Sequence, residues 1–431
     1  MSSALLLAVL VTALQDRIDH APAGGTVEIG PGTYAGDLVI DRPLHIIGRG
    51  RPRLIGSGKG TVVRIGAPHV TIEGLDIDGR GGGDLAEDPS GIHIAASNVT
   101  VRNCRIERTL FGVYLREANG AIVDGCAIRG IRGKEPGEKG SGIHVWNTTG
   151  FTITNNTIVD VRDGLYIQSS SHGRIAHNEA RELRYGLHYM FSDDNMFEDN
   201  TFRDGAAGAA LMYSRRITFR RNRFVHNRGF ASVGLLLKSC DDTLAEDNLI
   251  ADNARGVFVE GSARNVFRRN IIASSDVALV LYDSIEKNRF TGNSFVSNMT
   301  PLMFVGRRTD TIVDGNYWSD NDEPDLDGDG RTDRAYRLST VFDHFRGNLS
   351  AADLFSNTLA AKTLGTAERL FPVLEDVAVT DSSPLVRPPH LPRVPRTDVD
   401  EHGANPFGIA SSSIALVVGA FVLILGRRRS R

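Results

Sequence analysis

The sequence predicts an all-β chain that folds as a right-handed parallel β-helix, a solenoid with coils of roughly 22 residues. Three observations support this fold class: a repeated motif of glycine followed by alternating apolar residues, a column of asparagines in phase with that motif, and 46 glycines spread along 431 residues. Scattered glycines are typical of many tight turns. A short repeat cannot bury its apolar face alone, so neighbouring repeats have to stack.

The glycine motif fixes the period. Most of its steps are 22 residues long, and it begins at Gly91 (GIHIA), Gly112 (GVYLR), Gly142 (GIHVW), Gly164 (GLYIQ), Gly186 (GLHYM), Gly208 (GAALM), Gly234 (GLLLK) and Gly256 (GVFVE), then continues at Ala278 (ALVLY). The strict alternation of apolar positions is the period of a β-strand and excludes a helical repeat. A propeller blade would need about twice this period.

The polar column runs through Cys104, Cys126, Asn156, Asn178, Asn200, Asn222, Asn248, Asn270, Asn293 and Asn316. When coils stack about 4.8 Å apart, asparagines in such a column can form a ladder of side-chain amides. Cys104 and Cys126 occupy the same column in successive coils. Stacking permits either a disulfide or two buried free thiols there, and both interpretations stay open.

The ends of the chain predict a different organisation from its middle. We expect the β-helix over residues 14–345, a helical cap over 346–380 that covers the open strand edge, and a Pro-rich tether over 381–406. The uncharged run 407–426 is long enough for a transmembrane helix, and the arginines of 427–431 favour a cytoplasmic tail, which places everything before the span outside. Residues 1–13 are a signal peptide or the start of a capping helix.

One outer face of the predicted solenoid carries candidate metal ligands. If Leu187 and Tyr189 point inward, alternation sends His188 and Met190 outward. The same register places His144 and Met212 on that face, and His144, His188, Met190 and Met212 together are therefore our candidate copper ligands. Imidazole with thioether is a soft ligand set that suits Cu(I) bound transiently. The alternative interpretation is that the aromatic residues and methionines of this face form an adhesive surface for a partner protein or pack under a loop.

A second candidate site is the acidic segment DLDGDGRTD. Asp325, Asp327, Asp329 and Asp333 fall at positions one, three, five and nine of a calcium loop, and Gly330 stands at position six. Position twelve is Tyr336 rather than the usual glutamate. The segment is therefore a structural calcium site or an acidic solvated turn.

Composition narrows the function classes. A net charge of -3 gives no reason to expect a nucleic-acid partner. Carbohydrate lyases or epimerases are common on β-helices, but they need paired carboxylates or a base in an outer groove. The charged cluster of Lys238, Asp241 and Asp242 does not recur in such a geometry. A passive, metal-free docking scaffold is the third hypothesis.

Specific segments resemble the NosD family, accessory proteins of nitrous oxide reductase maturation. They are LQDRIDHAPAGGTVEIGPGTY (14–34), GLHYMFSDDN (186–195), NYWSD (316–320) with the Asp-rich loop, and SSPLVRP (382–388). The resemblance implies a non-enzymatic role outside the cytoplasm, alongside an ABC transporter ATPase, its membrane subunit and a copper chaperone, in supplying copper to nitrous oxide reductase. His188 and Met190 lie in the most specific segment. The predicted C-terminal span departs from the soluble periplasmic form usual in the family.

Overall fold

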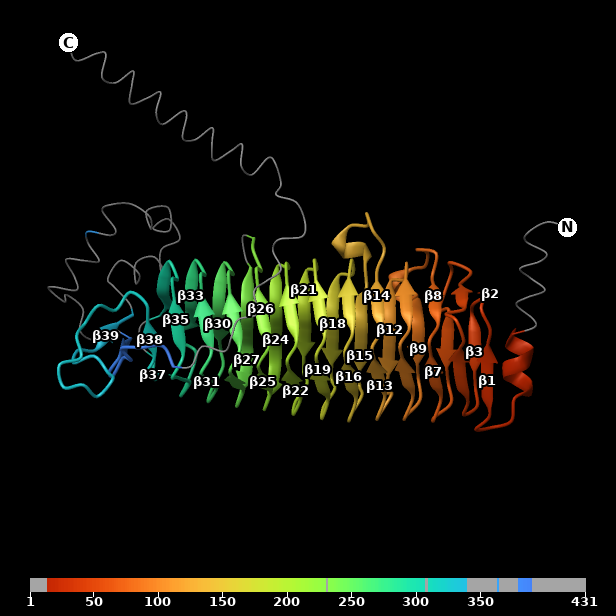
Figure 1. The fold of residues 1–431 in the computed structure, drawn as a ribbon, viewed down its shortest axis with the longest axis horizontal. Coiled ribbons are helices and arrows are strands. Elements are labelled where there is room, and N and C mark those ends of the chain that lie inside the picture. The colour runs from red at the N-terminus through yellow and green to blue at the C-terminus, as the bar shows by residue number, and fades with distance from the viewer. Residues whose placement is uncertain (1–13, 230–231, 307–308, 339–362, 364–378, 390–431) are drawn as a thin grey trace, which may run out of the picture. The chain divides into compact units, whose positions relative to one another are not determined.

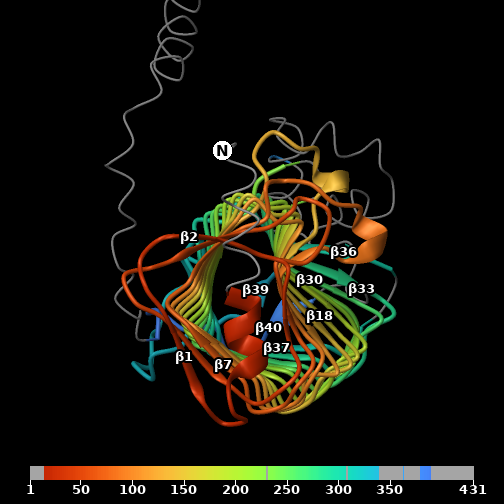
Figure 2. The ribbon, with the colours of Figure 1, turned by 90° about the vertical axis from the view of Figure 1, so that its right-hand side faces the viewer.

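The computed structural model describes residues 14–229, 232–306, 309–338, 363 and 379–389. They form a parallel β-helix of stacked coils, as the side view and the end-on view show (Figures 1 and 2). This confirms the predicted right-handed solenoid with coils about 22 residues apart. A full coil contributes one strand to each of three sheets, here named A, B and C, whose strands pair in parallel except for the last pair of sheet A.

Sheet A has 15 strands: β1 (Thr26–Ile29), β4 (His45–Gly48), β7 (Thr71–Glu73), β10 (Thr100–Arg102), β13 (Ile122–Asp124), β16 (Thr152–Thr154), β19 (Arg174–Ala176), β22 (Met196–Glu198), β25 (Thr218–Arg220), β28 (Leu244–Glu246), β31 (Val266–Arg268), β34 (Arg289–Thr291), β37 (Ile312–Asp314), β40 (Thr380–Asp381) and β39 (Tyr336–Arg337). Sheet B has 13 strands: β2 (Thr33–Ala35), β5 (Arg53–Ile55), β8 (Asp76–Asp78), β11 (Arg105–Glu107), β14 (Ala127–Arg129), β17 (Thr157–Val159), β20 (Glu179–Arg181), β23 (Thr201–Arg203), β26 (Arg223–Val225), β29 (Leu249–Ala251), β32 (Ile271–Ala273), β35 (Ser294–Val296) and β38 (Tyr317–Trp318).

Sheet C carries the candidate site, and its strands are longer from β9 onward. Its 12 strands among the described residues are β3 (Leu38–Ile40), β6 (Val63–Ile65), β9 (Ser90–Ile94), β12 (Phe111–Arg116), β15 (Ser141–Trp146), β18 (Asp163–Gln168), β21 (Tyr185–Met190), β24 (Ala207–Arg215), β27 (Val233–Asp241), β30 (Arg255–Glu260), β33 (Val277–Tyr282) and β36 (Thr300–Val305). Two short 3-10 helices, η1 (Leu85–Glu87) and η2 (Pro136–Glu138), lie in the loops before β9 and β15.

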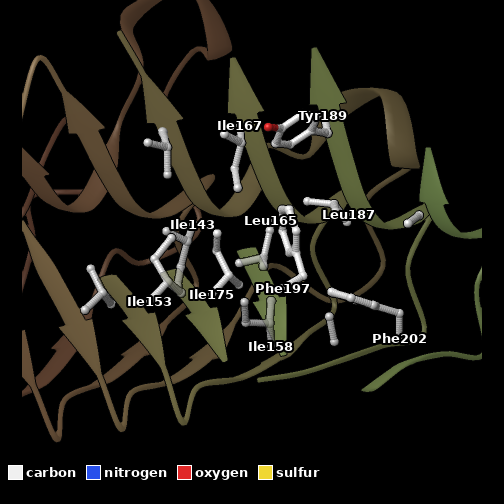
Figure 3. Close-up of a cluster of buried hydrophobic side chains, with 14 of the residues drawn as sticks. Ile143, Ile153, Ile158, Leu165, Ile167, Ile175, Leu187, Tyr189, Phe197 and Phe202 are labelled. Carbon is white, nitrogen blue, oxygen red and sulfur yellow. The ribbon is translucent and has the colours of Figure 1, made fainter. Parts of the chain in front are cut away.

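Alternation along each strand produces the core. In β21, Leu187 and Tyr189 are fully buried, whereas His188 and Met190 are half-buried on the outside. Figure 3 shows the inward side chains of successive coils packed on one another. Like residues stack in register, as with Phe267 and Phe290, whose ring centroids are 4.4 Å apart. The period-two pattern of the sequence therefore becomes an inside and an outside of the solenoid.

The predicted asparagine ladder is present at the turn between sheets A and B. Asn200 illustrates the pattern: its Oδ1 accepts hydrogen bonds from the backbone N and the Nδ2 of Asn178, at 3.0 and 2.9 Å. Its own Nδ2 donates to the Asn222 Oδ1 and to the Ile175 carbonyl, both at 2.9 Å. Cys126 joins the ladder through its backbone N, which donates to Asn156. Each amide thus satisfies buried backbone groups of neighbouring coils.

The cysteines of this column are free thiols. Cys104 and Cys126 are both buried and unbridged. The Cys104 thiol donates to the Arg102 carbonyl at 3.4 Å, and the Cys126 thiol donates to the Asp124 carbonyl at 3.5 Å. Of the two interpretations left open by the sequence, the structure has the pair of buried thiols in place of asparagine.

The N-terminal end of the solenoid is covered by a helix over residues 14–20 (Figure 2). Leu14 and Ile18 are each 1% exposed and belong to the main core. The Gln15 side chain donates to the Val39 carbonyl and accepts from the Val39 backbone N. These contacts cover the strand edge of the first coil. The signal-peptide interpretation concerns residues 1–13, which lie outside the described residues.

At the other end, Asp381 closes the asparagine ladder. It is fully buried in β40, which pairs with both β37 and β39. Its Oδ2 accepts hydrogen bonds from the Asn316 backbone N at 2.9 Å, the Asn316 Nδ2 at 3.1 Å and the Trp318 Nε1 at 3.0 Å. Leu385 then bridges to Tyr317. The sequence predicted a tether that begins at residue 381. This start is wrong, because Asp381 is packed into the last coil.

Most of the remaining C-terminal predictions lie outside the described residues. The expected helical cap of 346–380 is described at residues 363, 379 and 380, and of these Thr380 is in a strand rather than a helix. The tether beyond residue 389, the span 407–426 and the tail 427–431 are not described. Within the described part of the chain, no helix has the length and apolarity needed to cross a membrane.

Candidate functional site

A column of aromatic rings runs along the outer face of sheet C. Register places its members at equivalent positions of five successive strands: His93, Tyr114, His144, Tyr166 and His188. Centroids of neighbouring rings are 5.2, 4.4, 4.5 and 4.7 Å apart along this series. The first three contacts are stacked, and the last, between Tyr166 and His188, is edge-to-face. Of these residues, alternation and period had predicted His144 and His188 on one outer face.

His144 lies inside the stack rather than free on the surface. The Tyr114 and Tyr166 rings sandwich it, and Phe111 approaches its edge at 5.4 Å between centroids. Its Nδ1 is buried and makes no hydrogen bond with protein. Burial lowers the pKa of His144 to about 4, so the ring is neutral at physiological pH. The main contacts of His144 in this structure are therefore with aromatic rings.

His188 has a different environment because two charged residues hold it. Its Nδ1 lies 3.2 Å from the Asp163 Oδ2. Arg184 donates to both carboxylate oxygens of Asp163, at 2.9 and 2.6 Å. Burial alone would raise the pKa of Asp163, but the hydrogen bonds from His188 and Arg184 outweigh it and hold that pKa below the usual value. Arg184 Nη2 also lies 3.4 Å from the same Nδ1, so the tautomer decides which of the two contacts is a hydrogen bond. With a proton on Nδ1, the Asp163 contact is satisfied and Nε2 is the ring nitrogen with a lone pair.

Two methionines lie beside His188. Met190 lies two residues after His188 in β21, on the same face. Met212 is the direct partner of Met190 across the β21–β24 ladder. Both are half-buried. Neighbouring strands lie about 4.8 Å apart and same-face residues on one strand about 6.5–7 Å apart. The structure thus brings His188, Met190 and Met212 together, whereas His144 lies two coils from His188, on the other side of Tyr166.

Asp163 and Arg184 were missed by the sequence reasoning. Asp163 stands at the first position of the sheet C strand, immediately before the repeat glycine. The equivalent position in other coils holds Ser90, Phe111, Ser141, Tyr185, Ala207, Val233, Arg255, Val277 and Thr300. An acidic residue in this column is the signal that could have identified Asp163. Arg184 had no comparable signal, because it precedes the strand.

Loops cover the N-terminal part of this face. Leu110, Phe111 and Tyr114 form a small hydrophobic cluster outside the solenoid, against which Leu85, Ile131 and Trp146 pack. Leu85 belongs to η1, and Ile131 to the loop that carries η2. This packing explains why Tyr114 is buried although it points away from the core. It also raises the pKa of Tyr114 to about 12, mainly through burial.

The acidic segment forms a turn that gathers three carboxylates. Oxygens of Asp325, Asp327 and Asp329 lie within 4.8 Å of one another. Asp325 accepts hydrogen bonds from the backbone N of Gly328 and of Gly330, which close the turn. Asp333, the fourth predicted ligand, instead accepts from the Leu326 backbone N at 2.7 Å. The structure thus groups three of the four predicted calcium ligands.

Sheet B carries a shallow cleft lined by Arg53, Asp76, Ile77, Asp78, Arg105 and Glu107. Asp78 is buried and paired with Arg53 and Arg108. Burial would raise the pKa of Asp78. The hydrogen bonds from the Arg108 side chain, the Arg80 backbone N and the Arg53 side chain outweigh burial and lower this pKa to about 2. A general acid in glycoside chemistry needs the opposite shift, so Asp78 does not suit that role and is held as the partner of two arginines.

Comparison with known proteins bears on the whole chain. It is 34% identical over 409 residues, 90% of its length, to a protein of Pseudomonas aeruginosa called probable ABC transporter binding protein NosD, of which it covers 95%. The chain belongs to the NosD family. A NosD relative of the same description from Stutzerimonas stutzeri is 32% identical over 83% of the chain and 86% of the relative. The family model described as periplasmic copper-binding protein (NosD) matches residues 129–323.

Solved structures share the fold of this NosD-family chain. A family 28 exopolygalacturonase from Yersinia enterocolitica superimposes with a TM-score of 0.53 over 71% of the chain and 75% of the enzyme, at 13% identity. A double mutant of the periplasmic alginate epimerase AlgG gives a TM-score of 0.51 over 68% and 84%, also at 13% identity. At this identity the likeness concerns the β-helix alone.

Proposed function

We propose that this NosD-family chain is a non-enzymatic accessory protein, outside the cytoplasm, that holds copper for the maturation of nitrous oxide reductase. Its proposed partners are an ABC transporter ATPase with its membrane subunit, a copper chaperone and nitrous oxide reductase itself. The family description as a periplasmic copper-binding protein and the names of the two relatives support this proposal. We also propose that residues 407–426 anchor the chain in the membrane, with 427–431 inside.

The observation that carries the copper proposal is the Asp163–His188 contact beside Met190 and Met212. A histidine that ligates a metal usually donates its other ring N–H to a carboxylate, which fixes the tautomer and orients the ring. Asp163 is placed to do this for His188. The two thioethers supply soft ligands that favour Cu(I) over harder ions. Three neutral donors on an outer face suit an ion that is held and then released.

His144 completes the predicted ligand set under one condition. Its ring is held between Tyr114 and Tyr166. To reach an ion at His188, His144 would have to leave this stack and pass the Tyr166 ring, which lies between the two imidazoles. We therefore place His188, Met190 and Met212 at the centre of the proposed site and His144 at its margin.

Isothermal titration of Cu(I) into the purified full-length chain tests the proposal. The variants His188→Ala, Met190→Ala and Met212→Ala are each expected to weaken binding at least about tenfold, as loss of a metal ligand or its support does. His226→Ala is a matched control, because the His226 Nδ1 also lies beside a carboxylate, 2.6 Å from Asp252, but on an exposed turn. Met196→Ala, in β22 of sheet A, is the methionine control.

Two outcomes would contradict the copper proposal. One is the absence of Cu(I) binding by the parent chain. The other is ligand variants that bind no more weakly than the two controls. Release of shortened or unsaturated products from a polysaccharide by the same preparation would instead indicate an enzyme.

The acidic turn is proposed to bind calcium for structural support, through Asp325, Asp327 and Asp329. Without the bidentate glutamate of a full loop, we expect a Kd of about 0.1–1 mM, as in weak extracellular sites. Titration with Ca²⁺ is expected to show this binding in the parent chain and to lose it in Asp327→Asn. Glu323→Gln, outside the carboxylate cluster, should leave it unchanged. Equal binding by both variants, or none by the parent, would refute the calcium site.

A further inference from the structure

One position near the end of seven sheet C strands has a demanding backbone. It adopts a positive φ between 49° and 56° in seven successive coils, at Glu117, Asn147, Ser169, Phe191, Tyr213, Ser239 and Gly261. Tyr213 and Ser239 lie within β24 and β27, and the other five residues directly follow their strands. Asparagine and glycine tolerate this left-handed region, whereas it is unfavourable for bulky side chains. Phe191 and Tyr213 are therefore unexpected residues at this position.

These two aromatic residues are also exposed. Phe191 is 53% and Tyr213 46% accessible to solvent. Their rings stack on each other with centroids 5.1 Å apart and planes inclined by 10°. The stack fixes the orientation of both rings on the surface. Two adjacent coils thus place a rigid apolar pair in water at a backbone position that disfavours it.

Folding gains little from this arrangement, so it indicates binding. Burial of an aromatic ring in the core would stabilise the fold, but an exposed ring in a strained turn does not. Rigid exposed aromatics are instead enriched among residues that dominate protein interfaces. The Arg216–Asp194 ion pair beside the two rings is satisfied within the chain, at 2.6 Å. Recognition by the two rings themselves would depend on apolar contact.

The position of the pair identifies the kind of partner. Phe191 directly follows Met190, and Tyr213 directly follows Met212, the two thioethers of the proposed copper site. Transfer of Cu(I) between proteins requires that ligands of both share the ion, so their surfaces must touch beside the donor sulfurs. The ion keeps its oxidation state, and only metal–ligand bonds are exchanged.

We propose that Phe191 and Tyr213 form a docking contact for a protein that receives Cu(I) from Met190 and Met212. The partner presents an apolar patch next to its own soft ligand. This inference rests on the proposed copper function and adds to it a specific interaction surface. The aromatic pair positions the partner and does not hold the metal.

The double variant Phe191→Ser with Tyr213→Ser tests the docking contact. Serine occupies the equivalent position at residues 169 and 239, so the turn is expected to fold normally. The probe is copper-free nitrous oxide reductase, immobilised for binding measurements without copper and then used as acceptor from the Cu(I)-loaded chain. A small Cu(I) chelator, bicinchoninate, serves as an acceptor that needs no docking. Met299→Ser, which alters an apolar side chain that is 63% exposed in another coil, is the control.

We expect the double variant to weaken copper-free binding and to slow transfer to the protein acceptor at least tenfold, with transfer to the chelator unchanged. Met299→Ser should match the parent in every arm. Parent-like binding and transfer by the double variant would overturn the docking contact, and so would equal slowing toward both acceptors. Absence of Cu(I) binding by the parent would refute the copper function separately, because the copper-free binding arm still decides the docking contact.

Discussion

Asp163→Asn is expected to weaken Cu(I) binding about 10–100-fold, the usual effect of removing a carboxylate that orients a ligating histidine. The same change should destabilise the fold by roughly 2–4 kcal/mol, because it leaves the partly buried Arg184 guanidinium without its counter-charge. Cu(I) titration measures the first effect and urea unfolding the second. Both follow from a single carboxylate that contacts His188 and Arg184 together.

The pH dependence of stability gives an independent signature of Asp163. Its pKa is lower in the folded chain than in the unfolded chain, so the folded state favours the ionised form. This stabilisation is present above the unfolded-state pKa of about 4 and is lost as the pH falls through the folded-state pKa. Unfolding of Asp163→Asn is therefore expected to depend less steeply on pH in the acid range than unfolding of the parent.

A surface pair provides the control for Asp163. Asp252→Asn removes a carboxylate that also contacts a histidine and an arginine, His226 and Arg228, but its side chain is 43% exposed. We expect a loss within about 1 kcal/mol, because exposed ion pairs are solvated. Equal losses for the two variants, or a Cu(I) affinity of Asp163→Asn equal to that of the parent, would contradict the proposed role of Asp163.

Asn200→Leu is expected to lower the free energy of unfolding by about 2–6 kcal/mol. The leucine removes the acceptor of the Asn178 backbone N and the donor to the Ile175 carbonyl, whereas the Asn178 Nδ2 keeps its bonds to two backbone carbonyls. The first two groups are buried, and an unsatisfied buried polar group costs about 1–3 kcal/mol. The substitution interrupts the asparagine ladder in the middle of the solenoid. Each coil contacts mainly its neighbours, so no distant coil compensates for this loss.

Urea unfolding followed by circular dichroism measures this loss. Asn119→Ala is the control, since Asn119 is exposed and accepts one hydrogen bond from the Thr149 backbone N, at 2.8 Å. Its effect should stay within about 1 kcal/mol. If Asn200→Leu is no more destabilising than Asn119→Ala, the ladder does not stabilise the solenoid as described.

The fold could be predicted from the sequence because its information is periodic. One alternation separates inside from outside, and one period places residue i beside residue i+22, as with His144, Tyr166 and His188. The same logic placed Met190 beside Met212. Any feature that repeats, including the asparagine ladder, could therefore be predicted from the sequence.

Features that do not repeat could not be predicted from the sequence. The Asp163–His188 contact crosses between two columns of neighbouring coils, and the side-chain geometry that creates it has no periodic signature. Asp381 joins the ladder from a segment far along the chain, 65 residues after Asn316, which the repeat does not include. The burial of His144 also depends on its ring neighbours and on Phe111, so alternation predicted its direction but not its packing.

X-ray absorption at the copper edge of the Cu(I)-loaded chain tests the central claim most directly. The account predicts sulfur and imidazole nitrogen around the ion, with the sulfur contribution reduced in Met190→Ala and Met212→Ala and the imidazole contribution lost in His188→Ala. Met196→Ala should leave the spectrum unchanged. A copper ion surrounded by oxygen or nitrogen alone, or a spectrum indifferent to all three ligand variants, would contradict the account.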